Sequence, residues 1–395
     1  MKRFFSYSIL SFFLLLLPTG QASANNNDSI RLSLLTCAPG EEIYSLFGHT
    51  AIRYENSSQG IDVVFNYGLF SFNTPNFIFR FSLGETDYQL GATDYERFAA
   101  EYAFFGRSVW QQTLNLTDEE KTELIRLLQE NYRPENRVYR YNFFYDNCAT
   151  RPRDKIEESI AGKVVYPTEP QDGSRTFRDI VHQYCKGHPW ARFGIDLCIG
   201  SEADQPITQR QMMFAPFYLM DAFDGAQIKG DSIQRPLITA NELIVDATPE
   251  PDESGWMPTP LQCSLLLFIL TAAATIYGIR RRTGLWGIDL VLFGMAGIVG
   301  CVLAFLALFS QHPAVSSNFL LLVFHPGQLL FLPYIVYCVR KGKKCWYLTL
   351  NLVVLTLFIV LFPVIPQRFD FAVVPLALVL LIRSASNLIV TSKKK

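Results

Sequence analysis

Apolar and polar positions follow two different patterns along the chain, and the change comes near residue 260. Beyond it lie five apolar runs separated by short polar connections, each close to the roughly 20 residues that a helix needs to cross a bilayer. The runs cover 261–279, 285–309, 319–339, 346–365 and 371–390. We therefore predict an all-α membrane domain of five helices over 261–395, preceded by an acidic, proline-rich linker at 246–260.

Residues 25–245 carry shorter patterns, which predict an α+β domain with a small, mostly antiparallel sheet. Alternating apolar positions favour strands at 30–36, 48–54 and 61–67, the last two joined by a polar loop as in a hairpin. Helical periodicity appears at 116–131, where Thr117 and Glu120 form a capping box. An aromatic-rich extended segment then leads into a helix that begins just after Cys148. These last two elements, with one further expected helix, are placed at 138–145, 149–160 and 176–184.

The first 24 residues have the three parts of a secretory signal peptide. Lys2 and Arg3 form a basic start, 4–17 is an apolar core, and Ala22 and Ala24 make an A-x-A cleavage site. The alternative is an uncleaved anchor helix. In either case the segment that follows is exported.

The distribution of charge predicts the orientation in the membrane. The chain is 49% hydrophobic and only 18% charged, against about 25% charged for a soluble domain. Residues 261–395 carry a balance of +10 and residues 1–260 one of −11, which argues against a nucleic-acid binder because the basic residues are not on the globular part. Basic clusters follow the first, third and fifth runs, so these ends are expected in the cytoplasm. We predict a multi-pass protein of the inner (cytoplasmic) membrane with a periplasmic N-terminal domain and a cytoplasmic C-terminus.

Four of the eight cysteines lie in the exported part: Cys37, Cys148, Cys185 and Cys198. An oxidising compartment permits disulfides. Cys185 and Cys198 are close in sequence and are the favoured pair, with two free thiols as an equal alternative. No metal-ligand spacing is present, so we expect neither a metal site nor a cofactor.

Cys148 is the candidate nucleophile, because backbone N–H groups at a helix start can lower a thiol pKa and form an oxyanion hole. His49, which follows Gly48 at a strand start, is the candidate base, and Asn66 on the next strand is the residue to orient its ring. The alternatives are a structural histidine and a disulfide-bonded cysteine. Cys37 is the rival, either as the disulfide partner of Cys148 or as the nucleophile.

Five further residues are candidates for substrate binding. Asn147 precedes the nucleophile, and Arg151 and Arg153 follow it on the expected helix, where they offer contacts to a phosphate headgroup. His312 and Asn318 lie in the outer connection between the second and third membrane runs. The alternatives are a solvated helix face for the arginines and a plain polar loop for His312 and Asn318.

The order of these residues resembles the circularly permuted papain-like fold of lecithin:retinol acyltransferase and its relatives. The stretches LLTCAPGEEIYSLFGHTAIRY, FNYGLF, YNFFYDNCATRPRDKI, SRTFRDIVHQY, HPWARFGIDL and YLMDAFD resemble more closely the Lnb-type lipoprotein N-acyltransferases of bacteria. That resemblance implies transfer of an acyl chain from a membrane glycerophospholipid to the α-amine of a diacylglyceryl-cysteine lipoprotein. It also implies Cys148 as nucleophile, His49 as base and Asn66 as orienting residue, with no ATP and no metal.

Three other functions compete with this reading. A membrane-anchored, papain-like cysteine peptidase or amidase would share the same residues, but a single anchor helix would suffice for it. A non-catalytic lipoprotein-binding module predicts a disulfide-bonded Cys148 that can be replaced without effect. A thiol redox protein lacks the C-x-x-C pair that it would need.

Overall fold

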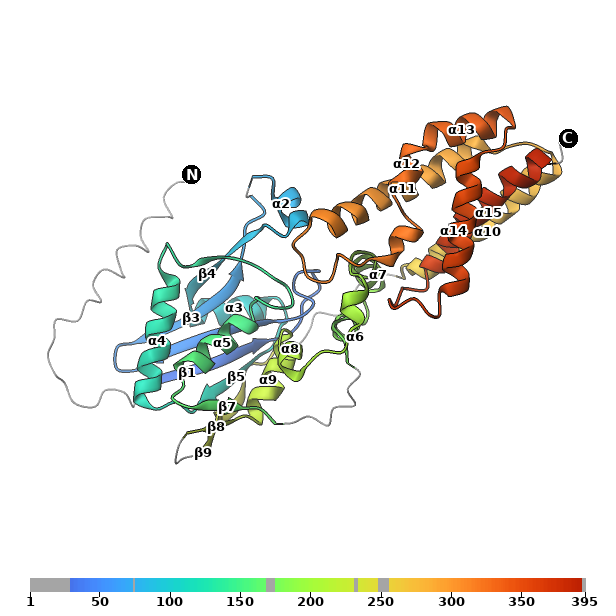
Figure 1. Cartoon of the computed structure of the whole chain (residues 1–395). Helices are drawn as coiled ribbons and strands as arrows, with labels where there is room; N and C mark the ends of the chain where they lie inside the picture. Colours follow the sequence, from blue (N-terminus) through green and yellow to red (C-terminus); the bar gives the residue numbers. More distant parts are fainter. Residues whose placement is uncertain (1–28, 74, 168–174, 231–233, 248–255, 393–395) are drawn as a thin grey trace, which may run out of the picture.

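The computed structural model describes residues 29–392, apart from 74, 168–174, 231–233 and 248–255. It has two parts arranged end to end, an α+β domain and a helical domain (Figure 1). The predicted signal peptide, part of the predicted linker and the last lysine cluster lie outside the described residues. The fold class expected from the sequence is confirmed for the described part of the chain.

A seven-stranded antiparallel sheet forms the centre of the α+β domain, in the order β10-β5-β1-β2-β3-β4-β6. The strands predicted at 30–36, 48–54 and 61–67 are the adjacent strands β1, β2 and β3. The seven strands are β1 (Ile30–Cys37), β2 (His49–Asn56), β3 (Ile61–Leu69), β4 (Asp87–Asp94), β5 (Val109–Leu114), β6 (Val138–Arg140) and β10 (Ile238–Val245).

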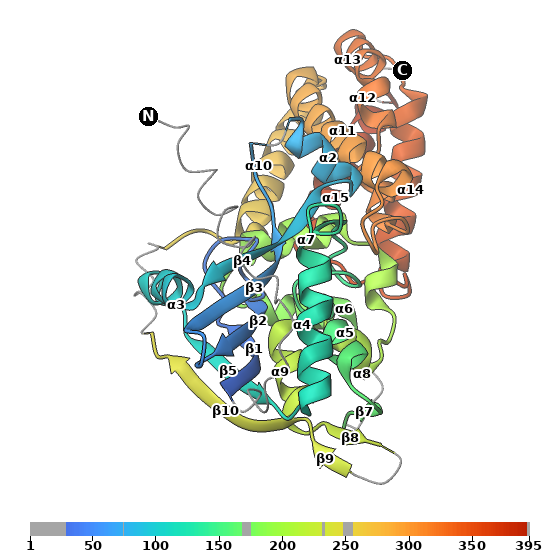
Figure 2. The same cartoon turned by 90° about the vertical axis from the view of Figure 1, so that its left-hand side faces the viewer.

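Helices cover both faces of this sheet (Figure 2). Helices α4 (Asp118–Tyr132), α5 (Thr150–Ser159) and α9 (Pro216–Asp224) pack on one face, and α3 (Tyr95–Phe104) packs on the other. Successive side chains of a strand point to opposite faces, so Leu34 belongs to the first core and Leu35 to the second. The capping box of Thr117 and Glu120 is present at the start of α4, as predicted.

The remaining elements of this domain are a second, smaller sheet and a group of short helices. A second, three-stranded sheet has the order β7-β8-β9, and a group of short helices lies between α5 and β8. These elements are β7 (Lys163–Val165), α6 (Phe177–Tyr184), α7 (Pro189–Cys198), η2 (Ser201–Asp204), α8 (Gln209–Met212), β8 (Gln227–Lys229) and β9 (Gln234–Pro236). The extended segment expected at 138–145 is a strand only as far as Arg140, and turns follow it up to Cys148.

The five apolar runs of the helical domain are all helical, but they do not form five equal spans. Within the described residues, three helices are long and apolar enough to cross a membrane. A fourth span would be a bent one, in which η3 (Phe319–Leu322) and α12 (Gly327–Leu330) come first and α13 (Leu332–Lys341) follows after a 75° bend. Helix α14 (Trp346–Leu361) has 16 residues, about 24 Å against the roughly 30 Å of a bilayer core. The three long helices are α10 (Pro260–Arg280), α11 (Trp286–Phe309) and α15 (Val373–Ser392).

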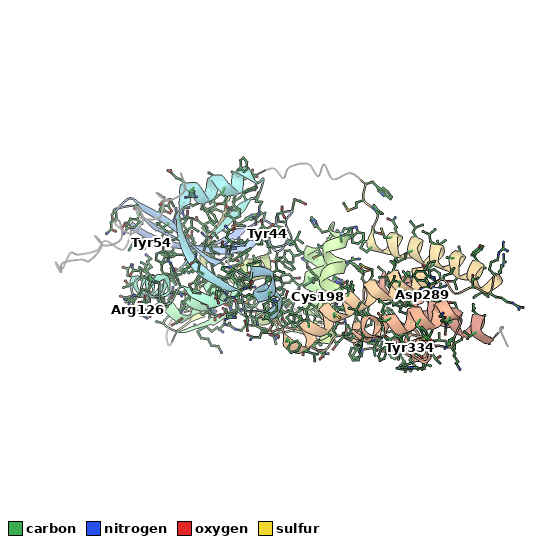
Figure 3. The ribbon with its side chains drawn as sticks, turned by 90° about the horizontal axis from the view of Figure 1, so that it is seen from above. Tyr44, Tyr54, Arg126, Cys198, Asp289 and Tyr334 are labelled. Carbon is green, nitrogen blue, oxygen red and sulfur yellow. The ribbon has the colours of Figure 1, made fainter. Side chains whose placement is uncertain are left out.

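The helical domain buries one ion pair between its long helices. Arg383 of α15 donates two hydrogen bonds to Asp289 of α11, 2.7 and 3.0 Å long, and a third to the hydroxyl of Thr275 on α10. Both charged side chains are buried. In Figure 3, Asp289 lies well along the helical domain, whereas Cys198 lies where the two domains meet.

Helices α10, α13 and α15 end at the pole of the helical domain farthest from the sheet (Figure 1). The basic residues Arg280, Arg340 and Lys341 are at the ends of α10 and α13. Their common position agrees with the orientation predicted from charge, in which these ends share one side of the membrane and the sheet domain is on the other.

Candidate active site

His49 and Asn66 meet on neighbouring strands. His49 is the first residue of β2, and Asn66 on β3 is paired in register with Ala51. The distance from His49 Nε2 to Asn66 Oδ1 is 3.2 Å. Because an amide oxygen only accepts, Nε2 carries the proton and Nδ1 keeps its lone pair. The ring is therefore held with Nδ1 as its basic atom.

Two glycines let the backbone pass close to its neighbours around these residues. Gly48 has a φ of +79°, and a Cβ there would lie 2.5 Å from the carbonyl oxygen of Cys37. Gly68 has a φ of +90° in an irregular part of β3, and a Cβ there would lie 3.6 Å from the Cβ of Cys148. Both positions favour glycine, because other residues seldom adopt positive φ. These two glycines therefore determine the path of the backbone where β2 begins and where β3 ends.

Cys148 lies in the turn before α5, next to the start of β2. Its thiol accepts hydrogen bonds from the backbone N–H groups of Thr50 and Cys148 and from the hydroxyl of Tyr141. Thr50 directly follows His49, so the thiol lies one residue away from the His49–Asn66 pair. The structure thus brings all three predicted residues, Cys148, His49 and Asn66, to one place between β2, β3 and the start of α5.

Burial keeps the thiol and the imidazole uncharged. Burial raises the pKa of the Cys148 thiol, although the three hydrogen bonds lower it in part. Burial lowers the pKa of His49 to about 4, while the hydrogen bond to Asn66 raises it. Near pH 7 the pair is therefore a thiol and a neutral imidazole, not a thiolate and an imidazolium. Such a pair needs the imidazole to accept the thiol proton as the nucleophile attacks.

Three tyrosines that the sequence did not single out, Tyr88, Tyr139 and Tyr141, lie around Cys148. Tyr141 donates to the thiol and stacks on Tyr88 of β4, with ring centroids 4.3 Å apart. The buried hydroxyl of Tyr139 has no hydrogen-bond partner among the described residues and lies beside Gly68, which also borders Cys148. Tyr139 and Tyr141 are two residues apart in an extended segment, so they lie on the same face of it. This spacing, just before Cys148, was the signal in the sequence that could have indicated them.

Two family models match the chain. A model described as the Lnb N-terminal periplasmic domain matches residues 20–182, and one described as the Lnb transmembrane domain matches residues 252–395. The chain belongs to the Lnb family. Searches of curated proteins and of solved structures each found no match. Membership makes this a multi-pass membrane protein with a periplasmic N-terminal domain and indicates an enzyme of lipoprotein maturation.

Asn147, Arg151 and Arg153 are each engaged within the protein. The Asn147 side chain is buried, and its amide donates to the carbonyl oxygens of Phe143 and Phe214 and accepts from the N–H groups of Ala149 and Thr150 at the start of α5. Arg151 makes two hydrogen bonds to Asp146, 2.6 and 2.8 Å long, and lies over the Tyr139 ring. The buried Arg153 pairs with Asp154 and the carbonyl oxygen of Arg210. In this Lnb protein, these contacts give all three residues a structural role around Cys148.

His312 and Asn318 lie at the junction of the two domains. His312 Nε2 is 2.6 Å from the carbonyl oxygen of Phe81 in α2 (Phe77–Leu83). Asn318 is buried and donates to the carbonyl oxygen of Leu197, at 2.7 Å. Both residues therefore hold the periplasmic domain against the helical domain.

Arg368 adds the strongest polar contact of this junction. Its guanidinium lies 2.5 Å from Asp179 and 2.9 Å from Asp204 of the periplasmic domain. Backbone hydrogen bonds from Gly200 and Ser201 to Ala314 and Ser317 lie alongside. The candidate site is thus carried by a domain that is fixed at several points to the helical domain.

The other three exported cysteines bear on the predicted Cys185–Cys198 disulfide and on Cys37 as the rival nucleophile. Cys185 and Cys198 are both free, so the favoured disulfide is wrong: Cys185 is buried among the side chains of an aromatic core, and Cys198 is at the far end of the next helix. Cys37 and Cys148 are free as well. Cys37 is buried, and burial raises the pKa of its thiol to about 12, which makes it a poor nucleophile. Within the described part of the chain, no cluster of His, Cys, Asp and Glu is suited to a metal ion.

Proposed function

We propose that this Lnb protein is a lipoprotein N-acyltransferase. It moves an acyl chain from a membrane glycerophospholipid, through a thioester on Cys148, to the α-amine of a diacylglyceryl-cysteine lipoprotein. The observation that carries the proposal is the Cys148 thiol, which accepts from the N–H of the residue after His49, together with the hydrogen bond from His49 to Asn66, in a periplasmic Lnb domain fixed to membrane helices. Both substrates are lipids of that membrane.

In the first half-reaction, Cys148 Sγ attacks the ester carbonyl carbon of the phospholipid while His49 Nδ1 takes the thiol proton. The C–O bond of the ester then breaks, and His49 returns the proton to the leaving alkoxide. The products are a thioester on Cys148 and a lysophospholipid. Asn66 keeps the Nε2–H tautomer throughout, so Nδ1 is free for both proton transfers.

In the second half-reaction, the lipoprotein amine attacks the thioester and His49 takes one of its protons. The C–S bond breaks, the thiolate regains that proton, and an amide is left on the lipoprotein. An exchange of ester for amide through a thioester needs no nucleotide and no metal. The scheme predicts ping-pong kinetics and an isolable acyl-enzyme.

Two groups beside Cys148 are suited to stabilise the oxyanion of each tetrahedral intermediate. The backbone N–H of Thr50 already points at the thiol. The hydroxyl of Tyr139 is buried and unpartnered within the described residues, which makes it an available donor. An oxyanion that formed next to Cys148 would accept from both, and each such donor is worth roughly 10²–10³ in rate.

The experiment uses the purified full-length protein in detergent with phospholipid and a diacylated lipopeptide that has a free α-amine. Mass spectrometry follows both lipids with wild type, Cys148→Ala and, as a matched cysteine variant away from the site, Cys198→Ala. The expected result is a gain of one acyl chain on the lipopeptide with wild type and Cys198→Ala, and none with Cys148→Ala.

Three results would contradict parts of the proposal. A gain that survives Cys148→Ala moves the nucleophile to another residue. Loss of phospholipid acyl chains that depends on Cys148, without any gain on the lipopeptide, makes the protein a phospholipase. If neither lipid changes with the wild-type protein, acyl transfer is refuted and the peptidase and binding-module functions return.

A further inference from the structure

An apolar groove of about 890 Å³ lies between α2 of the periplasmic domain and the outer part of α11. Its lining is mostly aromatic and aliphatic, with few polar groups. Its lining includes Phe77, Ile78 and Phe79 of α2 and Val302 and Phe305 of α11. The volume and the apolar lining are in the range of sites that hold small hydrophobic ligands.

Helix α2 presents apolar side chains away from its own domain. None of its residues is buried, and Ile78 and Phe79 are 80% and 58% exposed. It reaches the helical domain where α11 ends, as Figure 2 also shows, and the Phe79 ring lies 5.9 Å from that of Phe305. Because α11 is one of the long membrane helices, its outer end places the groove at the level of the outer leaflet. Apolar exposure of this kind marks a lipid-facing surface.

A continuous row of aromatic rings leads from this groove to the nucleophile. Phe77 lines the groove, and its ring centroid is 5.8 Å from that of Phe70. Phe70 lies 5.1 Å from Tyr88, and Tyr88 stacks on Tyr141 at 4.3 Å. The hydroxyl of Tyr141 bonds to the Cys148 thiol. All four rings are partly exposed, so they offer a surface along which a hydrocarbon chain can lie.

We propose that the groove and this row of rings hold the acyl chain of the donor glycerophospholipid. The chain lies there as Cys148 attacks its ester, and it stays there as the tail of the thioester. This inference rests on the proposed acyl transfer and adds the site for the donor tail. The donor is favoured over the acceptor because the row ends at Cys148 itself, the atom to which the donor chain becomes bonded.

The first test narrows the groove. Val302 is half exposed on α11, so Val302→Trp adds bulk to the groove without disturbing a packed core. The full-length protein receives phospholipids with decanoyl or palmitoyl chains, and transfer of each chain to the diacylated lipopeptide is measured. We expect the decanoyl-to-palmitoyl ratio to rise at least about tenfold, because a pocket that excludes several methylenes discriminates at least that strongly.

The matched control is Val291→Trp, an exposed position on the same helix about 16 Å deeper and outside the groove. It should leave the ratio unchanged. An unchanged ratio in Val302→Trp, or an equal change in Val291→Trp, overturns the proposal. Both variants must give the same helical circular dichroism as wild type, which keeps misfolding from imitating either result.

A second measurement does not require catalysis. Cys148→Ala is mixed with a phospholipid that has a diazirine at the end of one acyl chain, illuminated and digested for mass spectrometry. Labelling should concentrate in the peptides that carry α2 and the outer end of α11, and Val302→Trp should reduce it. Such labelling in a protein whose wild type transfers no chain would refute the proposed function but keep the groove as a lipid site. Transfer by wild type with labelling elsewhere refutes the groove alone.

Discussion

Lowering the pH tests whether His49 is neutral in the resting enzyme. Burial lowers the pKa of this histidine to about 4, from 6.5 for an exposed histidine. At about pH 5.5, a pKa of 4 leaves about 97% of the imidazole unprotonated, whereas a pKa of 6.5 leaves only about 9%. The two cases therefore differ roughly tenfold in the amount of base available to Cys148.

The assay is kcat/KM for the phospholipid donor, measured with the full-length protein between pH 4 and 8, because in a ping-pong scheme this quantity reports the first half-reaction and not the protonation of the acceptor amine. We expect a plateau that extends below pH 5.5 and an acidic midpoint near pH 4. Because folding depresses this pKa, the stability that neutral His49 contributes is present above pH 6.5 and is lost as the pH falls towards 4. Tryptophan fluorescence at each pH separates unfolding from loss of the base.

Asn66→Ala sharpens this test. The hydrogen bond from the ring to Asn66 raises the pKa of His49, so its removal moves the acidic midpoint down and not up. The plateau rate should fall by about tenfold, the value of one orienting hydrogen bond. A wild-type midpoint between pH 6 and 7 would refute the reasoning, because it would show a histidine that is charged as easily in the protein as in water.

Three further predictions follow from burial and contacts. Cys37→Ala should keep the acyl-enzyme and most of the activity, since burial raises the pKa of that thiol to about 12. Arg368→Ala should lower the free energy of unfolding by about 1–3 kcal/mol, because it removes charge-assisted hydrogen bonds to Asp179 and to the largely buried Asp204, whereas Arg126→Ala in a fully exposed pair should change it little. Gly48→Ala should destabilise by more than about 1 kcal/mol, because it combines positive φ with a clash, and Gly194→Ala in open space should not.

Each of these predictions has a direct check. Loss of the acyl-enzyme in Cys37→Ala, seen by intact-protein mass spectrometry, would make that residue part of the chemistry. Equal stability losses for Arg368→Ala and Arg126→Ala in urea unfolding would show that the domain junction contributes no more than a surface pair. Equal melting temperatures for Gly48→Ala and Gly194→Ala would mean that the approach of the strand to Cys37 is not as tight as described.

Local patterns were read correctly wherever the sequence alone controls the outcome. Strand alternation placed β1, β2 and β3, and the capping box placed the start of α4, because these signals depend on residues within a few positions. Apolar length located the helical segments of the membrane domain. It did not reveal the 75° bend between α12 and α13 or the shortness of α14. A run of apolar residues shows that a segment can be buried in lipid, but not where its helix ends or which way the helix axis points.

For the candidate site too, the sequence predicted some features and could not show others. Residue chemistry selected Cys148, His49 and Asn66 as candidates, and the family resemblance agreed, so the sequence by itself determined which groups the folded chain then brings together. It could not show that Arg151 and Arg153 are held by nearby carboxylates, or that His312 and Asn318 join the two domains. The sequence shows that a residue is charged or polar, but it does not show whether another group of the protein already binds that side chain.

Only the tertiary structure decided the state of the site and its surroundings. The sequence determined an α+β domain, apolar helices and a set of candidate catalytic side chains, because these follow from composition and short-range order. Burial, which makes Cys148 and His49 a neutral pair, depends on what the strands and helices place around them. The row of rings from Cys148 to the groove joins α2, β4 and the segments that directly follow β3 and β6, which only the folded chain brings together.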